Sequence, residues 1–401
     1  MNKFYSFSCR LYQRALYLAS FFLHFHEPKL LSGLDCSLEL PKLIKKQGQL
    51  HPLLITDKGL YDLGLTKKIS EAFLKENVSL SIFPGAVPNP TFECVDEAYE
   101  VYENDNCDCV IALGGGSSMD AGKALLIRIA YPNRQLSKFK GILKVHRKLR
   151  PLYAIPTTAG TGSEATLAAV LVDKTNKDKF QIDDPKLIPS YAILDPSYLT
   201  ALPRKVIAST GMDALTHAVE SYIGRSSTKK SKAYALQATS LIFENLEKFY
   251  EEPSNGIYAS NMQLASYKAG VSFSRAYVGY VHALAHSLGG FYNVPHGLAN
   301  AVLLPIVLEA YGKAAYKPLS ELAKAAGLKG ESKEKLAKAF IEEIRLLNAR
   351  MGIPNILNVS LEQGDLRKLA LHADKEGNPF YPVPKEFNVD ELESILKEAF
   401  S

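Results

Sequence analysis

Hydrophobic positions in the first half of the chain form short runs that alternate with amphipathic stretches. Each apolar run ends in polar or glycine-rich residues, whereas residues 91–104 place Val95, Ala98 and Val101 on one face of a predicted helix. Strands that alternate with helices are typical of βαβ units, which form an open parallel sheet and bind ligands at the carboxyl ends of its strands. The apolar runs that we predict to be strands are residues 53–56, 78–83, 109–113 and 152–155.

The pattern changes near residues 194–196, a Leu-Asp-Pro sequence. Beyond about residue 204, apolar positions recur almost entirely with a helical period. We therefore predict an N-terminal extension over residues 1–27, an α/β domain with a parallel sheet over residues 28–200, and an all-helical domain over residues 201–401. The long helices that we predict in the last part lie around residues 205–224, 228–250, 257–274 and 314–350.

The N-terminal extension contains an apolar run, residues 15–25, that is too short to cross a membrane. It has about half of the roughly twenty apolar residues that a spanning helix needs. A signal peptide is the alternative, because Arg10 and Arg14 precede the run, but histidines and a glutamate follow it in place of a small-residue cleavage site. We expect a helix that packs on the body of the protein or on a partner subunit.

Composition and charge narrow the class of protein. The 401 residues suffice for two domains, and 47% hydrophobic with 22% charged residues is a globular balance. The net charge of +5 is small and the basic residues are scattered, so we expect no nucleic-acid partner. An odd number of irregularly spaced cysteines argues against a disulfide framework and favours a reducing, cytoplasmic compartment. The cysteines are Cys9, Cys36, Cys94, Cys107 and Cys109.

A glycine-rich turn follows the third predicted strand and precedes a helix. Its sequence is Gly114-Gly115-Gly116-Ser117. Glycines let backbone N–H groups approach a pyrophosphate closely, and the helix N-terminus adds a favourable dipole. The turn has neither the G-x-G-x-x-G dinucleotide fingerprint nor the Gly-Lys-Ser/Thr ending of a P-loop. A plain strand-to-helix turn is therefore the alternative to a phosphate site.

Two other strand ends carry polar side chains that suit a dinucleotide. Residues 156–164 place the hydroxyls of Thr157, Thr158 and Thr161 after the fourth strand, where they can bond to phosphate or ribose or merely cap a helix. Asp57 follows the first strand, where a carboxylate can accept from both ribose hydroxyls and would repel the extra phosphate of NADP. The alternative for Asp57 is an ordinary turn residue. We predict NAD as the cofactor, with NADP as the alternative.

Five side chains that bind metals gather in two short windows of the helical part. Asp213 and His217 are four residues apart, so a helix places them on one face, and His282 and His286 repeat that spacing. His296 follows in a Pro-His-Gly sequence. Imidazoles with one carboxylate suit Fe(II) or Zn(II) better than Ca(II) or Mg(II). Spacing alone does not decide which of His282 and His286 binds the ion.

Together, the glycine, threonine and histidine windows resemble the iron-containing, or group III, alcohol dehydrogenases. The resemblance runs from about Pro28 to the carboxyl terminus and includes residues 88–91, 194–196 and 374–379. It implies an α/β N-terminal dinucleotide-binding domain with a parallel sheet and an all-α C-terminal metal-binding domain, an architecture like that of dehydroquinate synthase. Residues 1–27 look like an extension beyond the usual N-terminus of this family.

The resemblance also implies a role for individual residues. His286 would face the substrate or relay a proton beside the metal. Ser287 and Arg275 depart from the proline and asparagine that are frequent at these positions, so the resemblance does not name the substrate. The implied metal ligands are Asp213, His217, His282 and His296, and the implied cofactor contacts are Asp57, Asn89, Gly115, Gly116, Ser117, Thr157, Thr158, Thr161 and Lys179.

These observations predict a metal-dependent NAD(P) alcohol dehydrogenase that acts reversibly on a primary alcohol or diol and its aldehyde. We expect one divalent metal, Fe(II) in preference to Zn(II), acting as a Lewis acid, and a homodimer without a membrane span. The nicotinamide would accept the hydride and His286 would relay the proton. The alternatives are a glycerol dehydrogenase-like or other polyol or hydroxyacid oxidoreductase, a dehydroquinate synthase-like lyase, and a non-catalytic nucleotide-binding protein.

Overall fold

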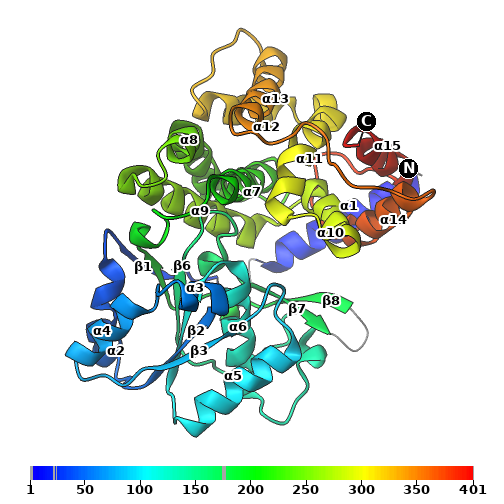
Figure 1. The fold of residues 1–401 in the computed structure, drawn as a ribbon. Coiled ribbons are helices and arrows are strands. Elements are labelled where there is room, and N and C mark those ends of the chain that lie inside the picture. The colour runs from blue at the N-terminus through cyan, green and yellow to red at the C-terminus, as the bar shows by residue number, and fades with distance from the viewer. Residues whose placement is uncertain (1–2, 21–22, 24, 174–177, 401) are drawn as a thin grey trace. The chain divides into compact units, whose positions relative to one another are not determined.

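The chain folds into two compact units, one built on a sheet and one built of helices (Figure 1). The structure is a computed structural model that describes residues 3–20, 23, 25–173 and 178–400. The sheet unit comprises Phe25–Thr158 and Gly162–Ala201. The helical unit comprises Met1–His24, Ala159–Thr161 and Leu202–Ser401.

The sheet unit is organised around a six-stranded sheet in which every pair of neighbouring strands is parallel. The strand order is β1-β9-β6-β4-β2-β3. The central strands β2, β4 and β6 are buried along nearly their whole length, which explains why they are apolar runs without alternation. The strands are β1 (Lys29–Ser32), β2 (Pro52–Asp57), β3 (Ser81–Ala86), β4 (Cys109–Gly114), β6 (Leu152–Pro156) and β9 (Tyr191–Leu194).

Helices follow the strands of this sheet, as the alternating pattern predicts. The hydroxyl of Thr91 caps α5 by accepting a hydrogen bond from the backbone N–H of Cys94 at 3.4 Å. Helix α6 buries Ala121, Ala124 and Leu125 in the core that it shares with the sheet. The helices are α2 (Leu40–Lys46), α3 (Lys58–Asp62), α4 (Lys67–Lys75), α5 (Phe92–Asn104) and α6 (Gly116–Ala130).

Two features of the sheet unit differ from the sequence prediction. Strand β3 begins later than residue 78 and continues through Pro84 and Gly85. A proline is tolerated in this strand because β3 lies at the edge of the sheet, where no second neighbouring strand needs the N–H that proline lacks. A second sheet, absent from the prediction, joins β5 (Gly141–Ile142), β8 (Asp178–Asp183) and β7 (Ala168–Asp173) in that order. Strand β5 has only two residues and β8 alternates polar with apolar residues, so neither gives a clear apolar run, whereas β7 is an apolar run that the prediction overlooked.

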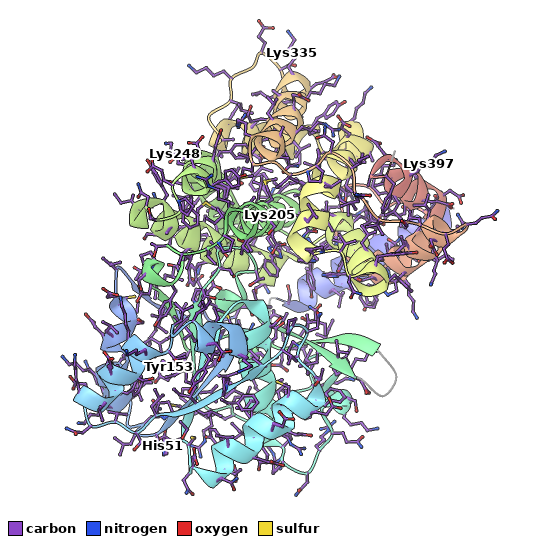
Figure 2. All side chains as sticks on the ribbon, viewed as in Figure 1. His51, Tyr153, Lys205, Lys248, Lys335 and Lys397 are labelled. Carbon is purple, nitrogen blue, oxygen red and sulfur yellow. The ribbon has the colours of Figure 1, made fainter. Side chains whose placement is uncertain are left out.

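The helical unit has α7 in its interior. Every residue of α7 from Gly211 to Ile223 is buried. Exposed lysines such as Lys335 and Lys397 extend from the periphery of the unit (Figure 2). The helices after residue 200 are α7 (Arg204–Ile223), α8 (Lys229–Glu251), α9 (Gly256–Ala276), α10 (Tyr280–Tyr292), α11 (His296–Tyr311), α12 (Tyr316–Ala325), α13 (Lys333–Arg350), α14 (Asp365–Gly377) and α15 (Val389–Glu398).

The single long helix predicted around residues 314–350 is wrong. The structure divides this segment into α12 and α13. Between them Gly327 has a φ of +81°, a conformation that ends a helix and that glycine adopts without strain. The other three long helices of the prediction are present as α7, α8 and α9.

Helix α1 (Lys3–Ala19) belongs to the helical unit and packs on the segment before α15. Arg10 forms an ion pair with Glu386 and donates to the backbone carbonyls of Val383 at 2.6 Å and Pro384 at 3.2 Å. The end of the predicted apolar run includes residues 21, 22 and 24, which lie outside the described residues. Among the helices that the structure describes, none combines the length and hydropathy needed to cross a membrane.

Candidate metal centre and cofactor site

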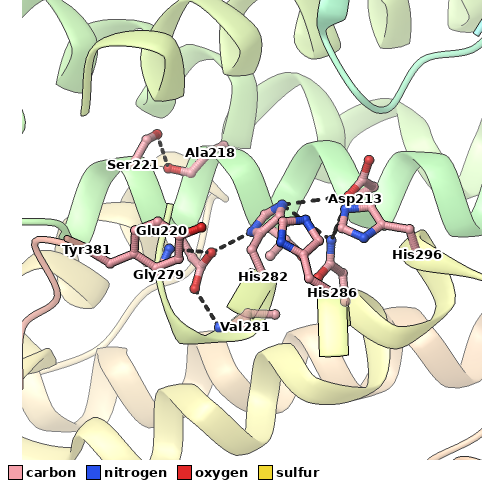
Figure 3. A network of polar contacts seen from close by, with 12 residues as sticks. Asp213, Ala218, Glu220, Ser221, Gly279, Val281, His282, His286, His296 and Tyr381 are labelled. Atoms are coloured by element: carbon pink, nitrogen blue, oxygen red, sulfur yellow. Dashed lines mark hydrogen bonds and ion pairs between the residues drawn. The ribbon is translucent and has the colours of Figure 1, made fainter. Parts of the chain in front are cut away.

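Three buried side chains of the helical unit converge on one point. Helix α7 carries Asp213 and His217 one turn apart on the same face, and α10 presents His282 to that face. One potential ligand atom of each side chain lies within 4.8 Å of those of the other two. Figure 3 shows His282 and Asp213 turned toward each other between the two helices.

Two further histidines border this cluster. His296 is the first residue of α11, and its Nε2 lies 3.3 Å from Asp213 Oδ1. The ring of His286, one turn after His282 on α10, stacks on that of His296 with centroids 5.1 Å apart. Both rings are partly exposed, unlike His217 and His282. The structure thus brings all five candidate side chains together, and Figure 3 shows four of them, Asp213, His282, His286 and His296.

Glu220, one turn after His217 on α7, fixes the orientation of His282. Its carboxylate accepts backbone hydrogen bonds from Gly279 at 2.9 Å and Val281 at 2.8 Å, and it lies 2.6 Å from His282 Nδ1. Burial raises the pKa of Glu220 to about 7, but both of its oxygens already accept backbone N–H groups, so His282 Nδ1 is the donor in this contact and Nε2 is the unprotonated ligand atom, 4.0 Å from Asp213 Oδ1. Carboxylate–histidine pairs of this kind orient metal ligands.

The amide of Asn300 lies among the candidate ligand atoms. Its Nδ2 donates to Asp213 Oδ1 at 2.7 Å and lies 3.1 Å from His296 Nε2 and 3.4 Å from His282 Nε2. Asn300 is fully buried, and its Oδ1 has no hydrogen-bond partner among the described residues. The amide NH₂ of Asn300, which carries partial positive charge, therefore lies among one carboxylate oxygen and two imidazole nitrogens. These three atoms are the kind of donors that bind a cation.

The charge states of the cluster suit a divalent metal. Burial opposes ionisation of Asp213, but electrostatic interaction with the neighbouring His217 and His296 and hydrogen bonds from His296 and Asn300 outweigh it and lower the pKa of Asp213 to about 2. Burial lowers the pKa of His217 to about 4 and that of His282 well below its usual value, so both imidazoles are neutral near pH 7. Neutral imidazoles and an ionised carboxylate are the forms that bind Fe(II) or Zn(II). The residues present therefore fit such an ion.

The predicted cofactor contacts lie mainly at one edge of the six-stranded sheet. Its neighbouring strands β6, β4, β2 and β3 are parallel, so their carboxyl ends meet at the same edge. Thr157 and Thr158 follow β6, Gly115–Ser117 follow β4, Asp57 ends β2, and Asn89 lies beyond β3. Ligands of open parallel sheets bind at such an edge.

The turn between β4 and α6 has the geometry of an anion site. Gly114 has a φ of +153°, and a Cβ there would lie 2.4 Å from Ser118 Oγ, so the turn requires glycine. Gly115 precedes the first turn of α6 and, with Gly116 and Ser117, is partly exposed. Their backbone N–H groups lie at the N-terminus of α6, where free N–H groups and the helix dipole favour binding of a phosphate.

Asp57 is both a helix cap and a free acceptor. Its Oδ1 accepts the backbone N–H of Leu60 at 2.9 Å and so caps α3. Its Oδ2 accepts no hydrogen bond from any residue that the structure describes. The capping role accounts for an aspartate in this turn, and the second oxygen leaves an acceptor for a ribose hydroxyl.

Two other predicted cofactor residues are assigned to other parts of the fold. Thr161 belongs to the helical unit. Lys179 lies in β8, where its backbone pairs with Val172 of the smaller sheet, and its side chain is outside the described ones. At the edge itself, Thr157 is buried and its N–H donates to the carbonyl of Gly114 at 3.0 Å.

Comparison with known proteins assigns the chain to a family. The sequence matches the family model described as "Iron-containing alcohol dehydrogenase" over residues 28–196. It matches the model described as "Fe-containing alcohol dehydrogenase family, C-terminal" over residues 207–400. The chain belongs to the iron-containing alcohol dehydrogenase family. The resemblance noted from the motifs is thereby confirmed, and with it an oxidoreductase that acts on CH–OH groups.

Individual members of the family match nearly the whole chain. The 1,3-propanediol dehydrogenase of Citrobacter freundii is 38% identical over 361 residues, 89% of this chain and 93% of the relative. The NAD-dependent methanol dehydrogenase of Bacillus methanolicus is 32% identical over 94% of this chain and 99% of the relative. A crystal structure of a 1,3-propanediol oxidoreductase superposes with a TM-score of 0.91 at 35% identity, covering 94% of this chain and all of the other. The predicted fold class is confirmed.

The sequence prediction missed Glu220, Asn300 and Lys123. The first two could have been found from spacing, because Glu220 lies three residues after His217 and Asn300 four after His296 on their helices. Lys123 gives no such signal. It is fully buried in α6, donates to Ser163 Oγ at 2.9 Å and to two other oxygens, and has its pKa lowered by burial to about 8.

Proposed function

We propose that this enzyme interconverts a primary alcohol or diol with its aldehyde, using NAD and one divalent metal held by Asp213, His217, His282 and His296. The observation that carries the proposal is the convergence of Asp213, His217 and His282 within 4.8 Å, inside a chain of the iron-containing alcohol dehydrogenase family. The names of two relatives, a 1,3-propanediol dehydrogenase and an NAD-dependent methanol dehydrogenase, support small alcohols and diols as the substrate class.

His286 is the proposed proton acceptor in alcohol oxidation. A bound divalent metal supplies Lewis acidity, which makes a nearby hydroxyl more acidic. His286 would take the hydroxyl proton and pass it to water, and bound NAD⁺ would supply the acceptor for the hydride, with both electrons, that leaves the carbinol carbon as its C–H bond breaks. The products are an aldehyde, NADH and one proton. Aldehyde reduction follows the same steps in reverse.

Asp57 supports NAD as the preferred cofactor. Its free Oδ2 can accept from a ribose hydroxyl, and its negative charge repels the additional phosphate of NADP. The exposed N-terminus of α6 is the proposed pyrophosphate site. The residues that we propose to contact the cofactor are Asp57, Asn89, Gly115, Gly116, Ser117, Thr157, Thr158, Thr161 and Lys179.

The proposed division of labour follows the two parts of the chain. Residues 28–200 would bind the dinucleotide and residues 201–401 the metal and substrate. We propose iron in preference to zinc because of the family to which the chain belongs. We also propose a cytoplasmic homodimer; the five free, buried cysteines fit a reducing compartment, and light scattering would measure the assembly state.

Metal-quantified protein tests the proposal directly. Protein loaded with Fe(II) or Zn(II) would be assayed against primary alcohols and diols with NAD and with NADP, following NADH or NADPH absorbance. We expect NAD-dependent turnover that is lost, together with bound metal, in His282→Ala. The exposed His146→Ala serves as the matched control and should keep both. Normal activity of metal-stripped protein would contradict the metal-dependent mechanism, and NADH that never leaves the enzyme would favour a dehydroquinate synthase-like lyase.

A further inference from the structure

A carboxylate on another helix holds the ring of His286. Nδ1 of His286 in α10 lies 2.7 Å from Oε1 of Glu376, near the end of α14. The hydroxyl of Tyr381 donates to the same oxygen at 2.7 Å. Each member of the His286–Glu376 pair is only about a quarter exposed, at 29% and 25%. A pair so shielded, with a second donor on the same oxygen, is better ordered than a surface ion pair.

The environment of Glu376 keeps it ionised. Burial by itself would raise the pKa of Glu376, but electrostatic interaction with the neighbouring His286 and the hydrogen bonds from His286 and Tyr381 outweigh burial, and the pKa lies below its usual range. An ionised carboxylate only accepts hydrogen bonds, so Nδ1 of His286 is the protonated nitrogen. The lone pair of a neutral ring is then on Nε2, which forms no hydrogen bond with any residue in the described part of the chain.

The surrounding chain fixes Glu376 in place. A Cβ added to the next residue, Gly377, would lie 2.8 Å from the ring of Tyr280, so α14 approaches α10 closely there. Tyr381 is held in turn by α1, because Gln13 Nε2 donates to its carbonyl at 2.9 Å. The carboxylate therefore reaches His286 from a helix that is closely packed against α10.

We propose that Glu376 is a positioning residue for the proton transfer at His286. It holds the ring in the Nδ1-protonated tautomer, so that Nε2 is the atom that takes the proton of the alcohol hydroxyl and later releases it to water. This inference rests on the proton-accepting role proposed for His286. An alternative is that the pair merely ties α14 to α10.

The test compares variants of Glu376 in the metal-loaded enzyme with NAD and the alcohol that turns over fastest in the panel above. Glu376→Gln keeps the shape but removes the charge, and its amide NH₂ can also donate to Nδ1 and stabilise the wrong tautomer. We expect kcat to fall by about 10- to 100-fold, with KM, metal content and melting temperature close to wild type. Glu376→Asp, which restores the charge, should recover part of kcat.

Glu398→Gln is the matched control, because Glu398 is an exposed glutamate on α15 of the same unit. It should leave kcat unchanged. Tyr381→Phe removes one donor to Glu376 and should have a smaller effect than Glu376→Gln. A wild-type kcat in Glu376→Gln would overturn the inference. So would a loss of kcat that follows a loss of metal or melting temperature and is not recovered by Glu376→Asp, because that result indicates a structural tie.

His286→Asn separates this inference from the function on which it rests. If His286→Asn keeps the wild-type kcat, the proton-accepting role of His286 has failed, and the proposal for Glu376 fails with it. If His286→Asn is slow and Glu376→Gln is not, only the inference about Glu376 has failed. In the double variant, Glu376→Gln should add no further loss, because a positioning residue acts only through the group that it positions.

Discussion

His217 illustrates how the interior of the helical unit sets the state of a single residue. Its ring stacks on Phe273 with centroids 4.1 Å apart and lies 4.4 Å from the ring of His282. Removal from water disfavours the imidazolium form and lowers its pKa to about 4, although the carboxylate of Asp213 acts in the opposite direction. The folded chain therefore holds this ligand in its metal-binding form at pH values where an exposed imidazole would be protonated.

The lowered pKa of His217 predicts a pH-dependent stability for the metal-free protein. Between pH 7.5 and pH 5 the unfolded chain, with a histidine pKa of about 6.5, binds a proton that the folded chain does not bind, so acidification favours unfolding. Relative to His217→Gln, the wild-type free energy of unfolding should fall by about 2 kcal/mol over this interval. Urea unfolding at both pH values measures the difference.

Thr216→Ser is the control for this measurement, since it changes the neighbouring buried position without a titratable group. Its difference from wild type should be the same at both pH values. A wild-type minus His217→Gln difference that does not change with pH would show that the folded site does not exclude the proton.

At the scale of elements, α1 attaches to the helical unit through one polar face. Arg10 pairs with the buried Glu386, and Gln13 donates to the backbone carbonyls of Pro379 at 3.1 Å and Tyr381 at 2.9 Å. Arg14, four residues after Arg10, is exposed. Of these two arginines of one helix, Arg10 is paired with a buried glutamate and Arg14 faces solvent. Both precede the same apolar run, so the sequence alone does not distinguish them.

Arg10→Ala should destabilise the helical unit. Removing one partner of a buried ion pair leaves an uncompensated charge and typically costs about 3–5 kcal/mol, and because Arg10 keeps some exposure we expect about 2–3 kcal/mol. This loss corresponds to a fall in melting temperature of roughly 4–10 °C. Arg14→Ala, the control in the same helix, should shift the melting temperature by less than about 2 °C. Equal shifts in melting temperature for Arg10→Ala and Arg14→Ala would mean that the contacts of Arg10 do not stabilise the helical unit.

At the scale of the whole molecule, the two ligands are expected on different units. The candidate metal ligands lie in α7, α10 and α11 of the helical unit. Most of the proposed cofactor contacts lie at the carboxyl ends of β2, β4 and β6 in the sheet unit. We therefore expect each ligand to stabilise mainly the unit that contains its own binding residues.

Hydrogen exchange with and without each ligand tests this separation. At 100 times its Kd a ligand adds about 2.7 kcal/mol, which slows exchange through unfolding of its unit by roughly 100-fold. Metal should protect the amides of α7, α10 and α11, and NAD those of β2, β4 and the first turn of α6, measured by mass spectrometry of peptides. Protection spread equally over both units by either ligand would contradict the assignment.

Much of the candidate site could be predicted from local sequence. A helix places residues four apart on one face, so the spacing of Asp213 and His217 indicates a shared ligand before any tertiary contact is known. Strand ends followed by glycine or hydroxyl-bearing residues likewise indicate the edge at which Asp57, Gly115 and Thr157 lie, because parallel strands have their carboxyl ends on one side. These relations depend only on the geometry of single elements and on the handedness of their connections.

Other features are decided only by tertiary packing. His286 and Glu376 are 90 residues apart, and Arg10 and Glu386 are brought together from near opposite ends of the chain. No periodicity links such residues, because their contact depends on how α14 packs on α10 and how α1 packs before α15. The choice between His282 and His286 has the same origin: the local spacing is equal, but only His282 lies against Glu220 and within reach of Asp213. Local sequence therefore predicts most of the elements and the donors on each, whereas packing decides which donors meet.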